Sequence, residues 1–167
     1  MILIVTGVAG SGKTTVGALI AGRLHWEFAD ADTFHPEANV AKMRAGIPLT
    51  DEDRLPWLRA IADWMDSRVA EGVSAVVTCS ALKRSYRDLL CSGGPAVEMI
   101  LLQVSRDELL RRLAARSGHF FPRQLLDSQL AALEPPGPGE RVHTIVADDD
   151  PGRTAERAIA ALGLRAS

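Results

Sequence analysis

The residues with the clearest chemical meaning are glycines, a lysine and a threonine near the N-terminus. The stretch Gly7-Val-Ala-Gly-Ser-Gly-Lys13-Thr14 follows an apolar run and opens an amphipathic segment. In such a turn the main-chain N–H groups converge on an anion, and the following helix adds the positive end of its dipole. A lysine at this position reaches the β- and γ-phosphates of a nucleotide, and the hydroxyl after it ligates Mg²⁺. The motif predicts a nucleotide site made of Gly7, Ala9, Gly10, Ser11, Gly12, Lys13, Thr14 and Thr15.

Two aspartates lie at the end of the second expected strand, as Asp30-Ala-Asp32. The C-terminal ends of parallel strands share one edge of a sheet, so we expect both carboxylates near the bound phosphates. One carboxylate can hold Mg²⁺ or its waters, while the other accepts a hydrogen bond from an attacking hydroxyl. Thr14 and Asp30 are the predicted metal residues. Two solvated loop aspartates are the alternative interpretation of this pair.

Arginines bracket the segment Gly118-His-Phe-Phe-Pro122, which lies between two helical patterns. The planar fork of an arginine can bond two phosphate oxygens at once. We expect a lid at about residues 116–123 that closes over ATP and excludes water, with Arg112 binding the nucleotide and Arg116 in a catalytic role. An ordinary helical connection with solvated arginines is the alternative.

The elements that must position these groups alternate along the chain. Strands are expected at 2–6, 27–30, 75–79, 98–104 and 142–146, and helices at about 13–24, 36–45, 51–71, 84–91, 106–115, 122–133 and 152–162. Strands separated by helices of this length favour right-handed crossovers and a parallel sheet. We therefore predict an α/β protein, with a five-stranded parallel sheet covered by helices on both faces. The Pro135-Pro-Gly-Pro-Gly139 cluster is expected to be a turn within a single domain over residues 1–167.

The third helical pattern carries a start signal and an apolar face. Thr50 with Asp53 three residues later indicates a capping box. Trp57 and Trp64 recur at helical spacing with apolar neighbours, so core packing is favoured over stacking against a substrate.

Composition and missing motifs exclude several classes. The formal net charge is −2, which gives no positive field for nucleic acid or a membrane surface. Cys79 and Cys91 form no paired framework, and no apolar run approaches the length of a membrane span. We therefore expect a cytoplasmic protein with no nucleic-acid or membrane partner. The guanine-reading Asn-Lys-x-Asp motif of Ras-type GTPases is absent, and the strand expected at 75–79 does not end in the aspartate usual for motor or transporter ATPases.

At this point the chain resembles the gluconate kinases of the thermoresistant type, within the shikimate-kinase-like P-loop small-molecule kinases. Beyond the glycine-rich loop, the resemblance rests on Asp30-Ala-Asp32, Phe34-His-Pro-Glu-Ala-Asn39, Lys42-Met43, Gly46-Ile-Pro-Leu-Thr-Asp-Glu-Asp-Arg54, Pro56-Trp57-Leu58, Cys79-Ser-Ala-Leu-Lys83, Tyr86-Arg-Asp88, Gly118-His-Phe-Phe121, Ser128-Gln129 and Leu133-Glu134-Pro135. Each piece is weak alone, and their order makes them specific.

The resemblance implies a reaction in which ATP and D-gluconate give ADP and 6-phosphogluconate, on the pentose phosphate or Entner–Doudoroff route. It implies a nucleoside-monophosphate-kinase-like core with a lid, Mg²⁺ as cofactor and a homodimer. By the same resemblance Lys13 clamps the phosphates, Thr14 ligates Mg²⁺, Arg116 is the lid arginine, Asp32 holds the acceptor hydroxyl and Arg54 grips the carboxylate.

The chemistry of gluconate sets a further expectation, since it is a linear polyol with one carboxylate. The substrate-binding helical region is expected at about residues 33–71. The candidate cations are Arg54, Lys83 and Arg87, and the candidate polar contacts are Asp32, His35, His119 and Gln129. Which cation binds the carboxylate stays open. His35 is equally well explained as a residue that ends the loop before Pro36. It also stays open whether Asp32 is a base or orients the hydroxyl.

Three rival functions share parts of this pattern. A kinase for another small acceptor, such as shikimate or a nucleoside monophosphate, would have the same core. A non-catalytic nucleotide-binding regulator would need no acceptor, and an adenylate-binding structural protein would leave Asp32 and the lid without a role.

Overall fold

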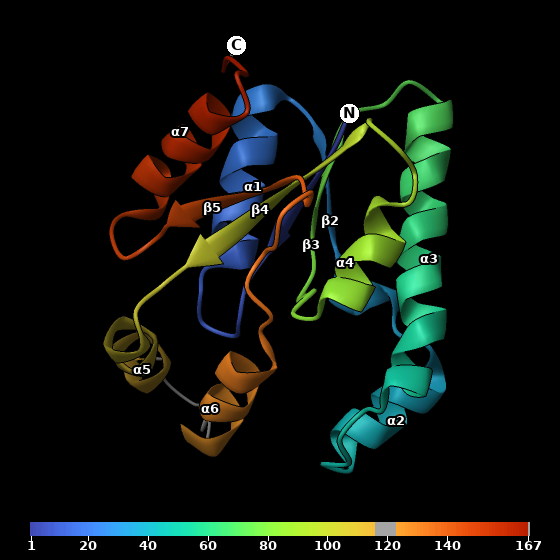
Figure 1. Ribbon diagram of the computed structural model, residues 1–167, viewed down its shortest axis with the longest axis vertical. Helices are drawn as coiled ribbons and strands as arrows, with labels where there is room; N and C mark the ends of the chain where they lie inside the picture. Colours follow the sequence, from blue (N-terminus) through green and yellow to red (C-terminus); the bar gives the residue numbers. More distant parts are fainter. Residues whose placement is uncertain (116–122, 167) are drawn as a thin grey trace.

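Five parallel strands form one sheet in the order β2-β3-β1-β4-β5 (Figure 1). The computed structural model describes residues 1–115 and 123–166. The strands are β1 (Ile2–Thr6), β2 (Glu27–Asp30), β3 (Ala75–Thr78), β4 (Val97–Gln103) and β5 (Val142–Val146). The helices are α1 (Lys13–Leu24), α2 (Glu37–Arg44), α3 (Asp51–Ala70), α4 (Arg84–Cys91), α5 (Arg106–Ala115), α6 (Arg123–Ala132) and α7 (Pro151–Ala161), and Ala31–Phe34 forms a 3₁₀ turn. The predicted α/β class is confirmed.

Helices cover both faces of the sheet, so the molecule has the three layers that were predicted. Figure 1 shows α1 and α7 on one side and α3 and α4 on the other. The central strand β1 is buried throughout because it is apolar on both faces. Ile2 and Ile4 pack toward α3 and α4, whereas Leu3 and Val5 pack toward α1 and α7. This alternation is the one expected for a strand inside a parallel sheet.

Helices α5 and α6 join the glycine-rich loop through a third, smaller core. It contains Val8 of the loop, Leu82, Leu109, Leu113 and Leu126. These contacts place α5 and α6 beside the loop rather than on a face of the sheet. No helix within residues 1–115 and 123–166 has the length and apolar character needed to cross a membrane.

The start of α3 follows its sequence signal closely. The Thr50 hydroxyl accepts from the Asp53 amide at 3.1 Å, and the Asp53 carboxylate accepts from the Thr50 amide at 2.9 Å. The predicted capping box is therefore confirmed, and Lys42 of α2 adds an ion pair to Asp53 at 2.8 Å. This geometry fixes the position of Arg54, one residue further along the helix.

The 3₁₀ turn Ala31–Phe34 was missed in the sequence because it is too short to show a period. It forms because the Asp30 side chain accepts from the Asp32 amide at 2.9 Å, and the Thr33 hydroxyl donates to the Asp30 carbonyl at 2.7 Å. The turn redirects the chain at the end of β2. It thus sets where the Asp32 side chain lies.

Helix α1 approaches the sheet closely at Gly17. A Cβ at this position would lie 2.7 Å from Thr78 Cγ2 and 3.2 Å from Phe28 Cε2. We expect Gly17→Ala to lower the free energy of unfolding by about 1 kcal/mol net, because overpacking of about 1–3 kcal/mol outweighs the helix-propensity gain of about 1 kcal/mol. Urea unfolding measures the change.

Gly22 of the same helix is the matched control, since a Cβ there meets nothing within 4 Å. Gly22→Ala should raise the free energy of unfolding by about 0.5–1 kcal/mol. Equal shifts in the same direction for both variants would contradict the close packing at Gly17.

Candidate active site

A polar cavity of about 360 Å³ opens at the carboxyl edge of the sheet, against the glycine-rich loop. We call it the phosphate cavity. Its lining residues are Ala9, Gly10, Gly12, Lys13, Thr14, Thr15, Asp30, Asp32, Thr78, Cys79, Ser80 and Gln129. Most of the predicted nucleotide residues therefore line one cavity. Gly7 and Ser11 belong to the loop but do not line it, and Ser11 is buried.

The loop has the backbone shape of an anion site. Gly10 and Gly12 have φ values of 81° and 90°, in the left-handed region that favours glycine. Helix α1 begins directly after Gly12, so its first N–H groups have no acceptor within the helix. The Lys13 ammonium donates to the Val8 carbonyl at 3.1 Å and lines the same cavity. These donors suit a polyphosphate.

Helix α6 is tied to the loop by Gln129. Its side-chain carbonyl accepts from the Ala9 main-chain N–H at 2.7 Å. This contact brings a residue predicted to bind substrate into direct contact with the nucleotide loop.

The oxygen ligands predicted for a metal lie on the wall of the phosphate cavity. Thr14 is exposed there, and Asp30 uses one carboxylate oxygen for the Asp32 amide at 2.9 Å. Within the described part of the chain no group of three or more His, Cys, Asp or Glu side chains could form a protein-only metal site. One hydroxyl and one carboxylate suit Mg²⁺, which keeps several waters and binds substrate phosphates. These residues therefore fit the predicted magnesium.

A second cavity of about 260 Å³ adjoins the first, and we call it the Arg54 cavity. It is lined by Asp32, His35, Met43, Leu49, Arg54, Trp57, Ser80, Leu82, Lys83, Tyr86, Ser128, Gln129 and Ala132. Asp32, Ser80 and Gln129 line both cavities. A small molecule in the Arg54 cavity would therefore place an atom at Asp32, beside the phosphate site.

Arg54 brings an uncompensated positive charge to this cavity. Its Nη1 donates to the Leu49 carbonyl at 2.9 Å and lies 3.5 Å from the Tyr86 hydroxyl. Its guanidinium carbon lies 5.9 Å from the centre of the Tyr86 ring. No carboxylate of residues 1–115 or 123–166 forms an ion pair with Arg54. The site can therefore accept one carboxylate from a ligand.

Lys83 lines the same cavity, but its charge is compensated. Its ammonium lies 3.0 Å and 3.2 Å from the two oxygens of Asp51. The Tyr86 hydroxyl donates to the same carboxylate. This hydrogen bond, followed by that from Lys83, holds the pKa of Asp51 below its ordinary value. Of these two cations, Arg54 is thus the better partner for an anionic ligand.

Arg87 does not reach the Arg54 cavity, which contradicts the prediction that it binds substrate. Its side chain is 2% exposed and pairs with Glu140 at 2.8 Å. It also donates to the Leu82 carbonyl at 2.9 Å. The hydrogen bond from Arg87 is the main cause of the lowered pKa of Glu140. Arg87 therefore braces the start of α4 against the chain before β5.

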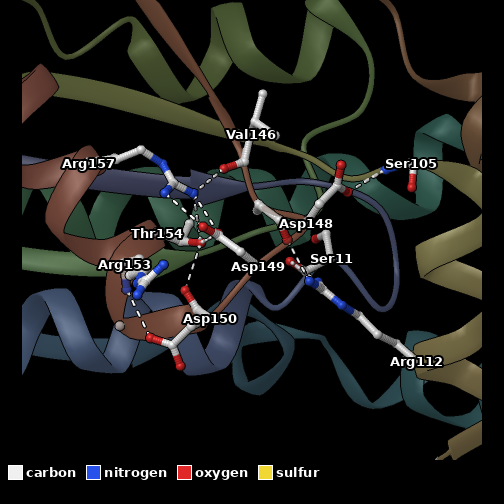
Figure 2. A network of polar contacts seen from close by, with 12 residues as sticks. Ser11, Ser105, Arg112, Val146, Asp148, Asp149, Asp150, Arg153, Thr154 and Arg157 are labelled. Atoms are coloured by element: carbon white, nitrogen blue, oxygen red, sulfur yellow. Dashed lines mark hydrogen bonds and ion pairs between the residues drawn. The ribbon is translucent and has the colours of Figure 1, made fainter.

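Arg112, which was predicted to bind ATP, lies against the loop from α5. It donates to the Ser11 carbonyl at 3.3 Å and the Ala147 carbonyl at 2.5 Å, and its Nε donates to Glu108 at 3.0 Å. Figure 2 shows Arg112 reaching Ser11 beside the chain that follows β5. One guanidinium thus connects the nucleotide loop to the segment between β5 and α7.

That segment holds three consecutive aspartates, all with partners in Figure 2. Asp148 accepts from the Ser105 amide at 2.9 Å, Asp149 pairs with Arg157 at 2.7 Å, and Asp150 accepts from the Arg153 amide at 3.2 Å. The last contact caps α7. The acidic run is therefore a structural element that fixes the loop next to Arg112.

Cys79 lies at the wall of the phosphate cavity and is 2% exposed. Burial raises the pKa of its thiol to about 12. Cys79 is therefore a buried thiol that stays protonated. Cys91 is half-buried, and burial also raises its pKa.

Two predicted residues, Arg116 and His119, lie outside the described residues, with most of the predicted lid. Conversely, sequence reasoning missed several residues at the site: Asn39, Thr78, Ser80 and Tyr86. Thr78 and Ser80 carry a usable signal, because they flank the end of β3 at the same edge as the loop.

Known proteins resemble this chain over nearly its whole length. A family model described as an AAA domain matches residues 2–136, which include both cavities. A gluconokinase of Gluconobacter oxydans is 48% identical over 157 residues, which cover 94% of this chain and 88% of that protein.

Solved structures of similar kinases also match nearly the whole chain. An unliganded sugar kinase from Janibacter sp. is 47% identical with a TM-score of 0.89, over 98% of this chain and 94% of that one. A gluconokinase from Sinorhizobium meliloti is 41% identical with a TM-score of 0.84, over 96% and 91% of the two chains.

Proposed function

The chain belongs to the gluconokinase family, and from this premise we propose that it transfers the γ-phosphoryl group of ATP to a hydroxyl of D-gluconate, releasing 6-phospho-D-gluconate. One observation carries the proposal. The phosphate cavity and the Arg54 cavity meet at Asp32, and Arg54, which lines only the second cavity, has no carboxylate partner among the described residues. A sugar acid fits this pair of cavities, with its carboxylate at Arg54 and a hydroxyl at Asp32.

The nucleotide side of the reaction follows from the glycine-rich loop. Phosphoryl transfer depends mainly on positioning and on positive charge at the phosphate oxygens. Lys13 and the N–H groups at the start of α1 provide both. Thr14 and Asp30 would hold Mg²⁺, which neutralises phosphate charge when bound. By family resemblance, Arg116 belongs to a lid that closes over ATP and adds positive charge at the phosphates.

Asp32 faces the acceptor hydroxyl in this proposal. Its side chain is exposed to both cavities, while its main-chain N–H is fixed by Asp30. Because the transition state is loose, the carboxylate chiefly orients the nucleophile and takes its proton late.

The remaining polar groups recognise the polyol. Arg54 binds the carboxylate, and His35 and Gln129 offer hydrogen bonds along the carbon chain. Lys83 with Asp51 forms a neutral pair at the cavity wall. A buried ligand carboxylate without such a cation would be costly, which is why a neutral polyol should bind poorly.

An acceptor panel tests the proposal directly. ADP release from ATP is measured with D-gluconate, shikimate, a nucleoside monophosphate and the neutral polyol sorbitol. Turnover should depend on gluconate. A preference for shikimate or the monophosphate would support another small-molecule kinase. ATP binding without any acceptor-dependent turnover would support a regulator.

The carboxylate partner gives a sharper prediction. Arg54→Met should raise the KM for gluconate roughly 10- to 100-fold, the loss expected for a hydrogen bond to a charged group, while changing kcat less. The preference for gluconate over sorbitol should shrink by the same factor. Steady-state kinetics with both acceptors measure it.

Arg59→Met is the matched control, because Arg59 is an exposed arginine of the same helix outside both cavities. Its kinetics should match those of the unmodified protein. If Arg54→Met leaves the gluconate KM unchanged, another cation binds the carboxylate.

Several finer assignments belong to the same proposal and rest on the family resemblance. They are Mg²⁺ as the metal, the cytoplasm as the location, a homodimer as the assembly, and supply of the pentose phosphate or Entner–Doudoroff route. Removal of Mg²⁺ with a chelator should stop turnover, and its return should restore it.

A further inference from the structure

We propose that Asn39 fixes His35 as the tautomer protonated on Nε2, so that His35 presents a constant N–H donor to the Arg54 cavity. This N–H group donates to an oxygen of the bound substrate, and that identification rests on the proposed function. Asn39, to which the sequence assigned no role, is then a positioning residue that acts through His35.

The hydrogen bonds of the buried Asn39 amide set the tautomer. Asn39 is 3% exposed, and its amide nitrogen lies 2.9 Å from the Asp53 carbonyl and 3.2 Å from His35 Nδ1. A main-chain carbonyl can only accept, so the atom facing it is the NH₂ group. One hydrogen goes to Asp53 and the other to His35 Nδ1. That ring nitrogen must then be unprotonated, which leaves the proton of the neutral ring on Nε2.

The His35 ring is also fixed through its face. It stacks on Trp57, with centroids 4.4 Å apart and planes at 9°. Trp57 is in turn buried and donates its indole N–H to the Ala31 carbonyl at 2.7 Å. With one face on Trp57 and Nδ1 on Asn39, the ring reaches the cavity through its Nε2 edge.

The neutral charge state follows from the same surroundings. Burial lowers the pKa of His35; Asp32 of the 3₁₀ turn opposes this shift and Arg54 of α3 reinforces it. The charged or titratable side chains that line the cavity with it are Asp32, Arg54, Lys83 and Tyr86. An imidazolium would also direct an Nδ1–H at the NH₂ group of Asn39. At neutral pH the ring is therefore a neutral donor, and it is not a base, because its lone pair accepts from Asn39.

A nuclear magnetic resonance measurement on the unmodified protein tests the tautomer without any need for turnover. The ¹⁵N spectrum contains four histidines, and His35→Gln identifies the signal of His35. We expect a protonated Nε2 and an unprotonated Nδ1 at pH 7 and at pH 8. A protonated Nδ1, a rapid average of tautomers, or an imidazolium at pH 7 overturns the proposal.

Asn39→Asp supplies the kinetic test. A carboxylate at position 39 accepts from Nδ1–H, which raises the His35 pKa and leaves Nε2 without a proton once the ring is neutral. Below the raised pKa the imidazolium still donates from Nε2, and above it the donor is lost. The gluconate KM of the variant should therefore rise roughly 3- to 10-fold from pH 6 to pH 8, while that of the unmodified protein stays flat.

Two further variants separate positioning from a structural role. His35→Gln keeps an N–H donor in the place of Nε2 and should raise the gluconate KM less than His35→Leu, which removes the donor and should raise the KM roughly 3- to 10-fold. Equal losses for both, or a flat profile for folded Asn39→Asp, contradict the proposal. If Asn39→Asp does not fold by circular dichroism, the spectrum of the unmodified protein still decides. A fixed tautomer in a protein that ignores gluconate would refute the proposed function alone.

Discussion

Lys13→Ala is expected to lower kcat for gluconate phosphorylation by about 10²- to 10³-fold, the loss seen when a fixed donor to transition-state charge is removed. The ammonium lines the phosphate cavity at the first residue of α1 and can reach the phosphates that the loop holds. Alanine is a good helix former, so the fold should persist. Coupled ADP-release kinetics and circular dichroism measure both effects.

Lys42→Ala is the matched control for a lost lysine. Lys42 pairs with Asp53 and lines neither cavity, so its removal should leave kcat within about threefold. A Lys13→Ala enzyme that turns over normally would mean that the loop does not hold the transferred phosphate.

The second large effect is expected for Asp32→Asn. The amide keeps the shape of the side chain but cannot take a proton, so kcat should fall by about 10²- to 10⁴-fold. The KM for ATP should change little, because the nucleotide is held by the loop. Within the described residues the Asp32 carboxylate accepts no hydrogen bond, so the substitution removes no contact that stabilises the fold.

Asp63→Asn, an exposed aspartate of α3 outside both cavities, is the control for this change. It should behave as the unmodified protein does. Turnover of Asp32→Asn at the normal rate would exclude both proposed roles of Asp32, as base and as orienting group.

The fold could be predicted from the sequence because its strands, its helices and the glycine-rich loop are each encoded by contiguous residues. β1 has the predicted bounds, since a buried parallel strand is a short apolar run between turns. The loop residues are contiguous, and their spacing alone fixes which groups face an anion.

The substrate side was harder because its charges are settled by distant residues. Arg54, Lys83 and Arg87 looked alike in sequence. Arg87 is neutralised by Glu140, 53 residues away, and Lys83 by Asp51, 32 residues away. Ion pairs between residues so far apart in the chain cannot be predicted from a local sequence pattern. The burial of Asn39 could not be predicted in this way either.

Trp57 shows a different limit. The sequence offered core packing and ligand stacking as alternatives, and burial to 4% exposure confirms the first. The same ring nevertheless lines the Arg54 cavity and supports His35. A side chain can thus belong to the core on one face and to the site on the other.

The wall formed by Asp32, Ser80 and Gln129 faces both cavities, and Gln129 is bonded to the nucleotide loop. A ligand bound in one cavity therefore contacts side chains that also contact the ligand in the other cavity. Thermodynamic linkage then makes the influence mutual: whatever factor nucleotide adds to the affinity for the sugar acid, the sugar acid must return to the nucleotide.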